Sequence, residues 1–157
     1  MSTRIVAAFA ALCAAAGVEI ATTPAAAQEL APFQVEGGEI RAPLTATPGD
    51  AARGREVVAG REEVSCLICH SLPGTEAIFK GDLGPSLAGV GARFSAARLR
   101  LWLVDAKRIA PNTIMPSYYK VDGLHQVAAR YRGKPILDAQ QIEDAVAYLS
   151  TLKEPAK

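Results

Sequence analysis

The chain has 157 residues, half of them hydrophobic, which fits one domain with a modest core. Its formal net charge is +1, and this near-balance gives no support for nucleic-acid binding, which usually shows as a strongly basic domain. The motifs along the chain must therefore indicate the function.

The first 27 residues have the parts of a secretory signal peptide. Arg4 supplies the positive n-region, residues 5–18 form an apolar run, and the alanines at 25–27 provide a cleavage site. A membrane anchor is the alternative, but the run is short for a span of about 20 apolar residues and Glu19 interrupts it. We expect residues 1–27 to be removed on export to the periplasm, with no membrane span left.

Signal cleavage would leave two of the three cysteines, since Cys13 lies within the signal. The bulky Leu12 before Cys13 disfavours a lipoprotein signal. Arg4 and Glu19 would leave together, so the net charge stays at +1. The mature chain therefore has either one disulfide or one chemical site that uses both thiols.

The first part of the mature chain divides into an arm and a helix. Residues 28–48 mix Pro, Gly, Glu and Thr without a helical or strand period, so we expect an extended N-terminal arm that is mobile or lies on a neighbouring surface. Asp50 is a candidate N-cap for a helix of about three turns that ends near Glu62. The residues of this helix available for burial are Ala51, Val57 and Val58.

The middle of the chain is predicted to be a loop followed by a second helix. Residues 71–93 hold too many glycines and prolines for regular structure, and we expect them to pass close to something flat, because glycine is favoured where backbone approaches a ligand. Ser95 is a candidate N-cap for a helix from 96 to about 107. Its predicted apolar face is Leu99, Trp102, Leu103 and Ala106.

The last third contains a proline-bounded loop, a long connection and a closing helix. Pro111 and Pro116 place Met115 on a loop, and residues 117–136 form a connection long enough to suggest a functional surface or partner contact. Asp138 is the N-cap of the final helix. Gln141 completes its capping box, Leu137 and Ile142 form a hydrophobic staple, and the predicted buried face is Ile142, Ala145, Val146 and Leu149.

No stretch alternates with period two, so we predict an all-α fold. Its expected parts are a signal peptide at 1–27, the arm at 28–48 and one domain at 49–157.

The chemistry is concentrated in Cys66-Leu67-Ile68-Cys69-His70. C-x-x-C-H is the attachment signature of a c-type haem: two thiols add across the haem vinyl groups and the histidine presents an imidazole to the iron. A thioredoxin-like redox pair would need a βαβ pattern, which is absent from the sequence. We therefore expect one covalently bound haem c, attached through Cys66 and Cys69.

Two haem-free alternatives account for less of the sequence. A structural zinc site usually needs four Cys or His ligands, and adjacent Cys69 and His70 would strain tetrahedral geometry. The mature chain has four such residues in total: Cys66, Cys69, His70 and His125. A plain disulfide would leave His70 and the following glycines unexplained.

The expected iron ligands are His70 on the proximal side and Met115 on the distal side. A lone methionine is more often core filler, but a loop fixed by two prolines suits a thioether that must meet iron at one position. His125 is the other distal candidate, and its polar surroundings indicate a surface histidine. His/Met coordination raises the potential and leaves no open site, so it predicts electron transfer rather than substrate chemistry.

The order of motifs resembles the class I cytochromes c. Gly54-x-x-x-Val58 precedes C-x-x-C-H, and Gly84-Pro85-x-Leu87, Met115-Pro116 and a closing helix follow. The resemblance implies that the first and last helices cross beside the haem and that the Pro85 carbonyl accepts a hydrogen bond from His70, which would orient the ring. It offers Arg93 as a partner of a haem propionate, with a solvated arginine as the alternative.

A narrower resemblance covers residues 80–152. The segment beginning Met115-Pro116-Ser117-Tyr118-Tyr119 and the final helix are similar to SoxX, the monohaem subunit of the SoxAX cytochrome of bacterial sulfur oxidation. The arm matches that family only loosely, and the resemblance gives His125 no role.

This resemblance implies a heterodimer with a SoxA-type cytochrome. The complex, an L-cysteine S-thiosulfotransferase, joins thiosulfate to a cysteine of the SoxYZ carrier and releases two electrons. The SoxA haem carries the substrate chemistry, while the SoxX subunit is not catalytic by itself and passes electrons to a small cytochrome c. The alternative is a free-standing periplasmic cytochrome c shuttle, and the +1 balance argues mildly against one, since shuttles often use a strongly charged ring for steering.

Overall fold

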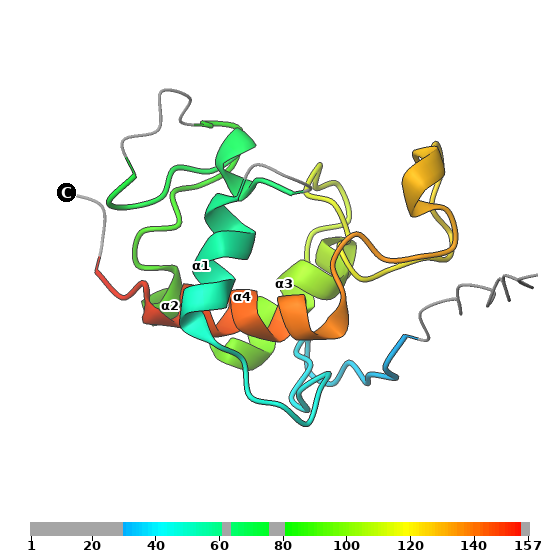
Figure 1. Cartoon of the computed structure of the whole chain (residues 1–157), viewed down its shortest axis with the longest axis horizontal. Helices are drawn as coiled ribbons and strands as arrows, with labels where there is room; N and C mark the ends of the chain where they lie inside the picture. Colours follow the sequence, from blue (N-terminus) through cyan, green and yellow to red (C-terminus); the bar gives the residue numbers. More distant parts are fainter. Residues whose placement is uncertain (1–29, 61–63, 76–80, 155–157) are drawn as a thin grey trace, which may run out of the picture.

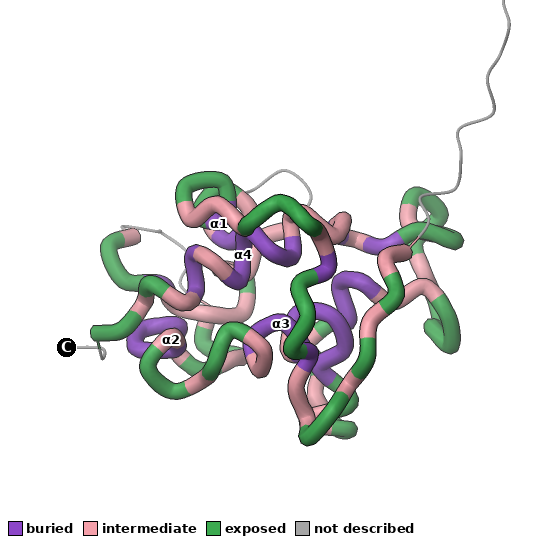
Figure 2. The backbone as a smooth tube through the Cα atoms, turned by 90° about the horizontal axis from the view of Figure 1, so that it is seen from below, coloured by how far each residue is buried: buried purple, intermediate pink, exposed green. Residues whose placement is uncertain are grey.

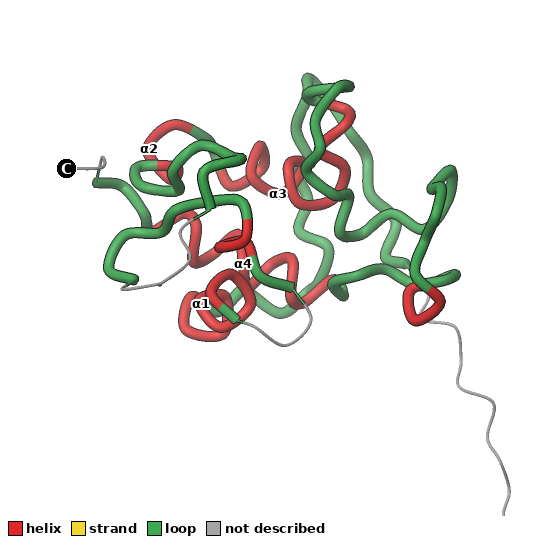
Figure 3. Tube along the Cα trace, turned by 90° about the horizontal axis from the view of Figure 1, so that it is seen from above, coloured by secondary structure: helices red, strands yellow, loops and turns green. Residues whose placement is uncertain are grey.

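The computed structural model describes residues 30–60, 64–75 and 81–154, and within them the fold is all-α. Its elements in chain order are α1 (Ala51–Ala59), η1 (Cys66–Ile68), α2 (Val90–Arg93), α3 (Ala96–Asp105), η2 (Ala106–Arg108), η3 (Ala129–Tyr131) and α4 (Ala139–Thr151). Figure 3 shows these helices joined by long loops, and the one β-bridge among the described residues pairs Glu36 with Glu39. The prediction of an all-α fold is confirmed, whereas the predicted signal peptide lies outside the described residues.

Helix α1 crosses α4 at a glycine (Figure 1). A Cβ atom at Gly54 would collide with the carbonyl oxygen of Asp144 and lie 2.8 Å from the Cβ of Tyr148. A side chain at this position would therefore force the two backbones apart. One turn later, Val58 is completely buried, which places the crossing in the core.

The ends of α1 follow local rules. The Asp50 side chain accepts a hydrogen bond from the Arg53 amide (2.8 Å), as the predicted N-cap requires. The helix ends at Ala59, where Gly60 is extended, so it is shorter than expected, and Glu62 lies outside the described residues.

Asp144 joins α4 to the beginning of α1. Its carboxylate accepts hydrogen bonds from the Asp50 amide (2.8 Å), from the Arg53 guanidinium (2.7 and 2.8 Å) and from Gln140 (2.9 Å). Burial by itself would raise the pKa of Asp144, but these hydrogen bonds, led by the one from Arg53, outweigh burial and lower it. The carboxylate is therefore held ionised at the helix crossing.

Helix α3 packs against α4 through a buried ion pair. Arg100 and Glu143 are only 6 % and 5 % exposed, and the guanidinium donates to both carboxylate oxygens at 2.7 and 2.8 Å. Arg100 also donates to the Ile40 carbonyl (2.7 Å), and Glu143 accepts from the Leu44 amide (2.9 Å). These two bonds bring the N-terminal arm to the same pair.

The arm lies on α3 and α4 of its own chain. Ile40 is completely buried, its amide donates to the Ala97 carbonyl (3.1 Å), and Leu44 belongs to the same core. At the beginning of the described chain, the Ala31 amide donates to the Tyr119 hydroxyl (2.7 Å). The arm was expected to be mobile or to lie on a neighbouring surface, and residues 30–48 lie against their own domain. Figure 2 marks the buried residues along the backbone in purple.

Helix α3 is buried on more than one face, so its predicted single apolar face is incomplete. Leu99, Leu103 and Ala106 are buried as expected, but Leu101 and Val104 are completely buried as well. The reason is that neighbours cover several sides: α4 and the arm do so through Arg100, and the Tyr118 amide donates to the Leu103 carbonyl (3.0 Å). The helix stops at Asp105 and η2 continues it to Arg108.

Two other elements test the local rules. The described parts of 71–93, residues 71–75 and 81–93, contain one short helix, α2, which was not expected. The Gly91 amide donates to the Leu152 carbonyl just beyond α4 (2.9 Å). The capping box of Asp138 and Gln141 is present at the start of α4. The residues of the predicted face of α4 are all buried: Ile142, Ala145, Val146 and Leu149.

None of the helices in the described ranges is both long and apolar enough to cross a membrane.

Replacing Glu143 with Gln tests the buried ion pair. Glu143→Gln preserves the shape but removes the charge, leaving Arg100 unneutralised in the core. We expect the free energy of unfolding to fall by about 3 kcal/mol, measured by urea denaturation. Glu56→Gln on the exposed side of α1 is the matched control and should change it by less than about 0.5 kcal/mol. Equal effects of the two variants would contradict a special role for the pair.

Candidate haem-binding site

The C-x-x-C-H motif forms a single tight turn. The amides of Cys69 and His70 both donate to the Cys66 carbonyl, at 3.1 and 2.8 Å, so η1 presents both cysteines and the histidine from one turn. Both cysteines are free and partly buried. Burial raises the pKa of the Cys66 thiol to about 11.

The segment 81–87 runs beside this turn and fixes the histidine ring. The amides of Gly81 and Gly84 donate to the carbonyls of Leu67 (3.0 Å) and Cys69 (2.7 Å). A Cβ atom at Gly84 would lie 2.6 Å from Nδ1 of His70. The flat group that this glycine-rich segment approaches is therefore the imidazole itself.

The carbonyl oxygen of Pro85 lies 2.7 Å from Nδ1 of His70. With the proton on Nδ1, this nitrogen donates to the carbonyl and the lone pair of Nε2 is available to a metal. This is the contact that the proposed role of Pro85 requires.

A cavity of about 270 Å³ opens beside the motif. The residues proposed from the sequence for the haem site all line it: Cys66, Cys69, His70, Pro85, Arg93 and Met115. Most other wall residues are apolar and come from the segment 83–94, from α3, from the Met115 loop and from α4, including Leu87, Leu99, Leu103 and Leu149. The structure thus brings together residues 66–70 and Met115, which are far apart in sequence.

His125 does not belong to the cavity. Its side chain is exposed and is not part of the cavity wall, whereas Met115 is partly buried and packs against the core. Of the two distal candidates, only Met115 lines the cavity, and its role as an iron ligand stays a prediction.

Arg93 lies on the cavity wall but also makes local bonds. Its guanidinium donates to the carbonyls of Ala88 (2.6 Å) and Ser86 (3.0 Å). Two of its five N–H groups are used in this way, so the side chain stiffens the turn that follows Pro85. Pairing with a haem propionate stays a prediction, to be made by the other N–H groups.

Trp102 is a wall residue that the sequence assigned only to the helix core. Within the described part of the chain, its buried Nε1 has no hydrogen-bond partner. A carboxylate of a bound group would supply the missing acceptor. The available signal was that this is the only tryptophan in the sequence and lies on the predicted apolar face.

Tyr118 is a second wall residue that local patterns did not single out. Burial, and to a smaller degree the neighbouring Cys66 and Cys69, raise the pKa of its hydroxyl, which stays neutral. Tyr118 belongs to the segment after Met115 and lines the same cavity as Cys66 and Cys69, so this segment lies on the cysteine side of the fold.

The site residues fit a covalently attached haem. Two thiols on one turn, an oriented imidazole and a loop thioether surround a largely apolar cavity. The orphaned Trp102 Nε1 adds a donor for a carboxylate. The described residues contain no group of three His, Cys, Asp or Glu placed to hold a metal ion.

Comparisons with known proteins agree with this site. A family model described as cytochrome c matches residues 51–153. The crystal structure of SoxXA from P. pantotrophus matches with 37 % identity and a TM-score of 0.71, covering 78 % of this chain and 95 % of the matched chain. The chain belongs to the cytochrome c family, as a SoxX-type class I member.

The structure of the c-type cytochrome SorU from Sinorhizobium meliloti is a further match to this SoxX-type cytochrome. The identity is 27 %, the TM-score is 0.44, and the match covers 68 % of this chain and 94 % of that one. No curated protein matches the chain.

Replacing Gly84 with Ala tests the contact that fixes the ring of the SoxX-type cytochrome. The added Cβ would overlap the His70 imidazole, so we expect the ring to shift and the unfolding free energy to fall by about 1–3 kcal/mol. Denaturant unfolding and the haem absorption spectrum are the measurements. Asp82→Ala, on the exposed neighbour two residues earlier, is the control and should leave both unchanged. A Gly84→Ala protein that matches this control would refute the close contact.

Proposed function

We propose that this electron-transfer cytochrome holds one haem c and acts as the SoxX-type subunit of a periplasmic thiosulfate-oxidising complex. In this role it accepts electrons released when thiosulfate is joined to the SoxYZ carrier cysteine. The observation that carries the proposal is the 37 % identity to the SoxXA structure over 95 % of the matched chain.

The bound haem would supply a one-electron centre. Cys66 and Cys69 hold it by two thioether bonds, and His70 offers Nε2 because Pro85 accepts the hydrogen bond from Nδ1. Met115 offers its sulfur from the loop on the cavity wall. If His70 and Met115 both held the iron, no open site would remain, which would suit a relay rather than substrate chemistry.

Exposed apolar side chains near the motif support a persistent partner. Ile68 is 70 % exposed and Leu83 is 68 % exposed, and Leu83 also lines the cavity. Apolar surface of this kind favours a lasting protein contact, since the buried centre of an interface is apolar and depleted in charge. A SoxA-type cytochrome is the partner that the resemblance supplies.

Co-purification from native periplasm tests the proposal. We expect a haem-bearing partner to be recovered with this chain, and haem staining after denaturing electrophoresis to mark this chain. Recovery only as a haem-bearing monomer would favour the free-standing shuttle instead. Absence of haem stain on the matured protein would contradict both cytochrome functions.

The choice of Met115 over His125 can be tested with one pair of variants. Met115→Leu should lower the reduction potential, within the range of about 0.8 V that axial ligands span, and open the iron to external ligands. His125→Leu is the control and should change neither property. Potentiometric titration and the spectrum with added imidazole measure both. The reverse pattern would assign the distal ligand to His125.

A further inference from the structure

The net positive charge of the chain is concentrated in one segment. Residues 106–134 contain one acidic side chain, Asp122, and six basic ones: Lys107, Arg108, Lys120, Arg130, Arg132 and Lys134. This segment has a net charge of +5 in a chain of net charge +1, so the remainder carries −4. The overall balance therefore conceals a strong asymmetry.

Two of the basic side chains come together at one carboxylate. Arg108 Nε and Lys120 Nζ lie 3.6 and 3.5 Å from the same oxygen of Asp105, a buried residue that also accepts from Ser117 (2.8 Å). The chain before and after the Met115 loop thus meets at Asp105. One carboxylate can neutralise only one of these two cations.

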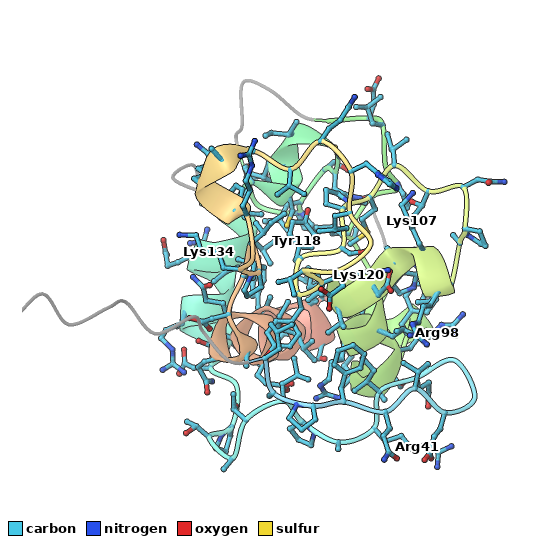
Figure 4. The ribbon with its side chains drawn as sticks, turned by 90° about the vertical axis from the view of Figure 1, so that its right-hand side faces the viewer. Arg41, Arg98, Lys107, Tyr118, Lys120 and Lys134 are labelled. Carbon is cyan, nitrogen blue, oxygen red and sulfur yellow. The ribbon has the colours of Figure 1, made fainter. Side chains whose placement is uncertain are left out.

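The long connection is held to the same side of the fold. The Tyr118 carbonyl accepts hydrogen bonds from the amides of Ile136 (2.9 Å) and Leu137 (3.0 Å), which fixes both ends of the loop. Figure 4 looks onto this side of the molecule, where Lys107, Lys120 and Lys134 are labelled. We call the six basic side chains of 106–134, together with Ile114, the basic face.

Ile114 gives the basic face an apolar point next to the cavity. Its side chain is 74 % exposed although it also lines the cavity, and it precedes Met115 in the same loop. An apolar contact surrounded by polar and charged groups is the usual arrangement of an interface. Because Ile114 both lines the cavity and is exposed to solvent, this part of the surface lies directly beside the cavity.

We propose that the basic face docks the acidic surface of a soluble redox protein, which takes the electron from this chain. The inference rests on the proposed function and names the acceptor by its charge. Exposed lysines and arginines accelerate encounter with an acidic partner and suit a transient contact, whereas the exposed apolar Ile68 and Leu83 suit a lasting one. With haem bound, one electron would pass from this chain, which is oxidised, to the redox centre of the acceptor, which is reduced.

The test compares a charge reversal on the basic face with a matched reversal elsewhere. Lys107→Glu with Lys134→Glu alters two exposed residues of the face. Arg55→Glu with Lys153→Glu makes the same change in net charge on α1 and near the C-terminus, which lie on the other side in Figure 1. The reduced holoproteins are mixed by stopped flow with two oxidised small c-type cytochromes of similar potential, one acidic and one basic, over a range of ionic strength.

We expect the unaltered protein to react faster with the acidic cytochrome at low salt and to lose this advantage as salt screens the charges. The face variant should lose about tenfold or more of the rate at low salt, and the control variant should keep it. Equal rates for the two variants, or no preference for the acidic cytochrome, would overturn the inference. Tighter co-sedimentation with vesicles of anionic phospholipid than binding to the acidic cytochrome would assign the face to a membrane instead. Haem content and spectrum are recorded first, because loss of haem in the unaltered protein would count against the proposed function itself.

Discussion

The backbone contact between α1 and α4 at Gly54 is the constraint from which the haem cavity is built. It leaves no room for a side chain, so the two helix backbones pack at one fixed distance from each other. Helix α1 leads within a few residues to the turn that carries Cys66, while α4 contributes Leu149 to the cavity wall. The position of the thiols relative to that wall therefore depends on a joint that Asp144 further fastens through Arg53 and Asp50.

A second joint, the Arg100–Glu143 pair, positions the opposite wall. It ties α3 to α4 and to the arm, and α3 contributes Leu99, Trp102 and Leu103 to the cavity. Because α4 takes part in both contacts, it fixes the positions of the two cavity walls relative to each other. A buried ion pair adds little net stability compared with apolar packing, but it tolerates few alternative arrangements. Its contribution here is to hold three separate segments in one geometry.

Local sequence rules predicted the features in which the interacting residues are close to each other in the chain. The caps at Asp50 and Ser95 act over three residues, and the prolines on either side of Met115 impose the loop directly. The burial of Ile40 was not predictable in this way, because Arg100, which binds its carbonyl, is 60 residues away. The contact of Pro85 with His70 spans 15 residues and was reached through the resemblance to the class I cytochromes c, since no periodicity reveals it.

The net charge of the chain also says less than the positions of its charged residues. A net charge of +1 argued mildly against electrostatic steering, but steering depends on where charges lie, and one segment of this chain holds +5. The apolar side chains Ile68 and Leu83 belong to the segments around the C-x-x-C-H turn. The basic residues belong to the segments before and after the Met115 loop, which lie on the right of the ribbon in Figure 1. A relay must meet one protein that delivers an electron and another that removes it. Two surfaces of different chemistry, one apolar at Ile68 and Leu83 and one basic around the Met115 loop, would let two partners bind without competing for the same site.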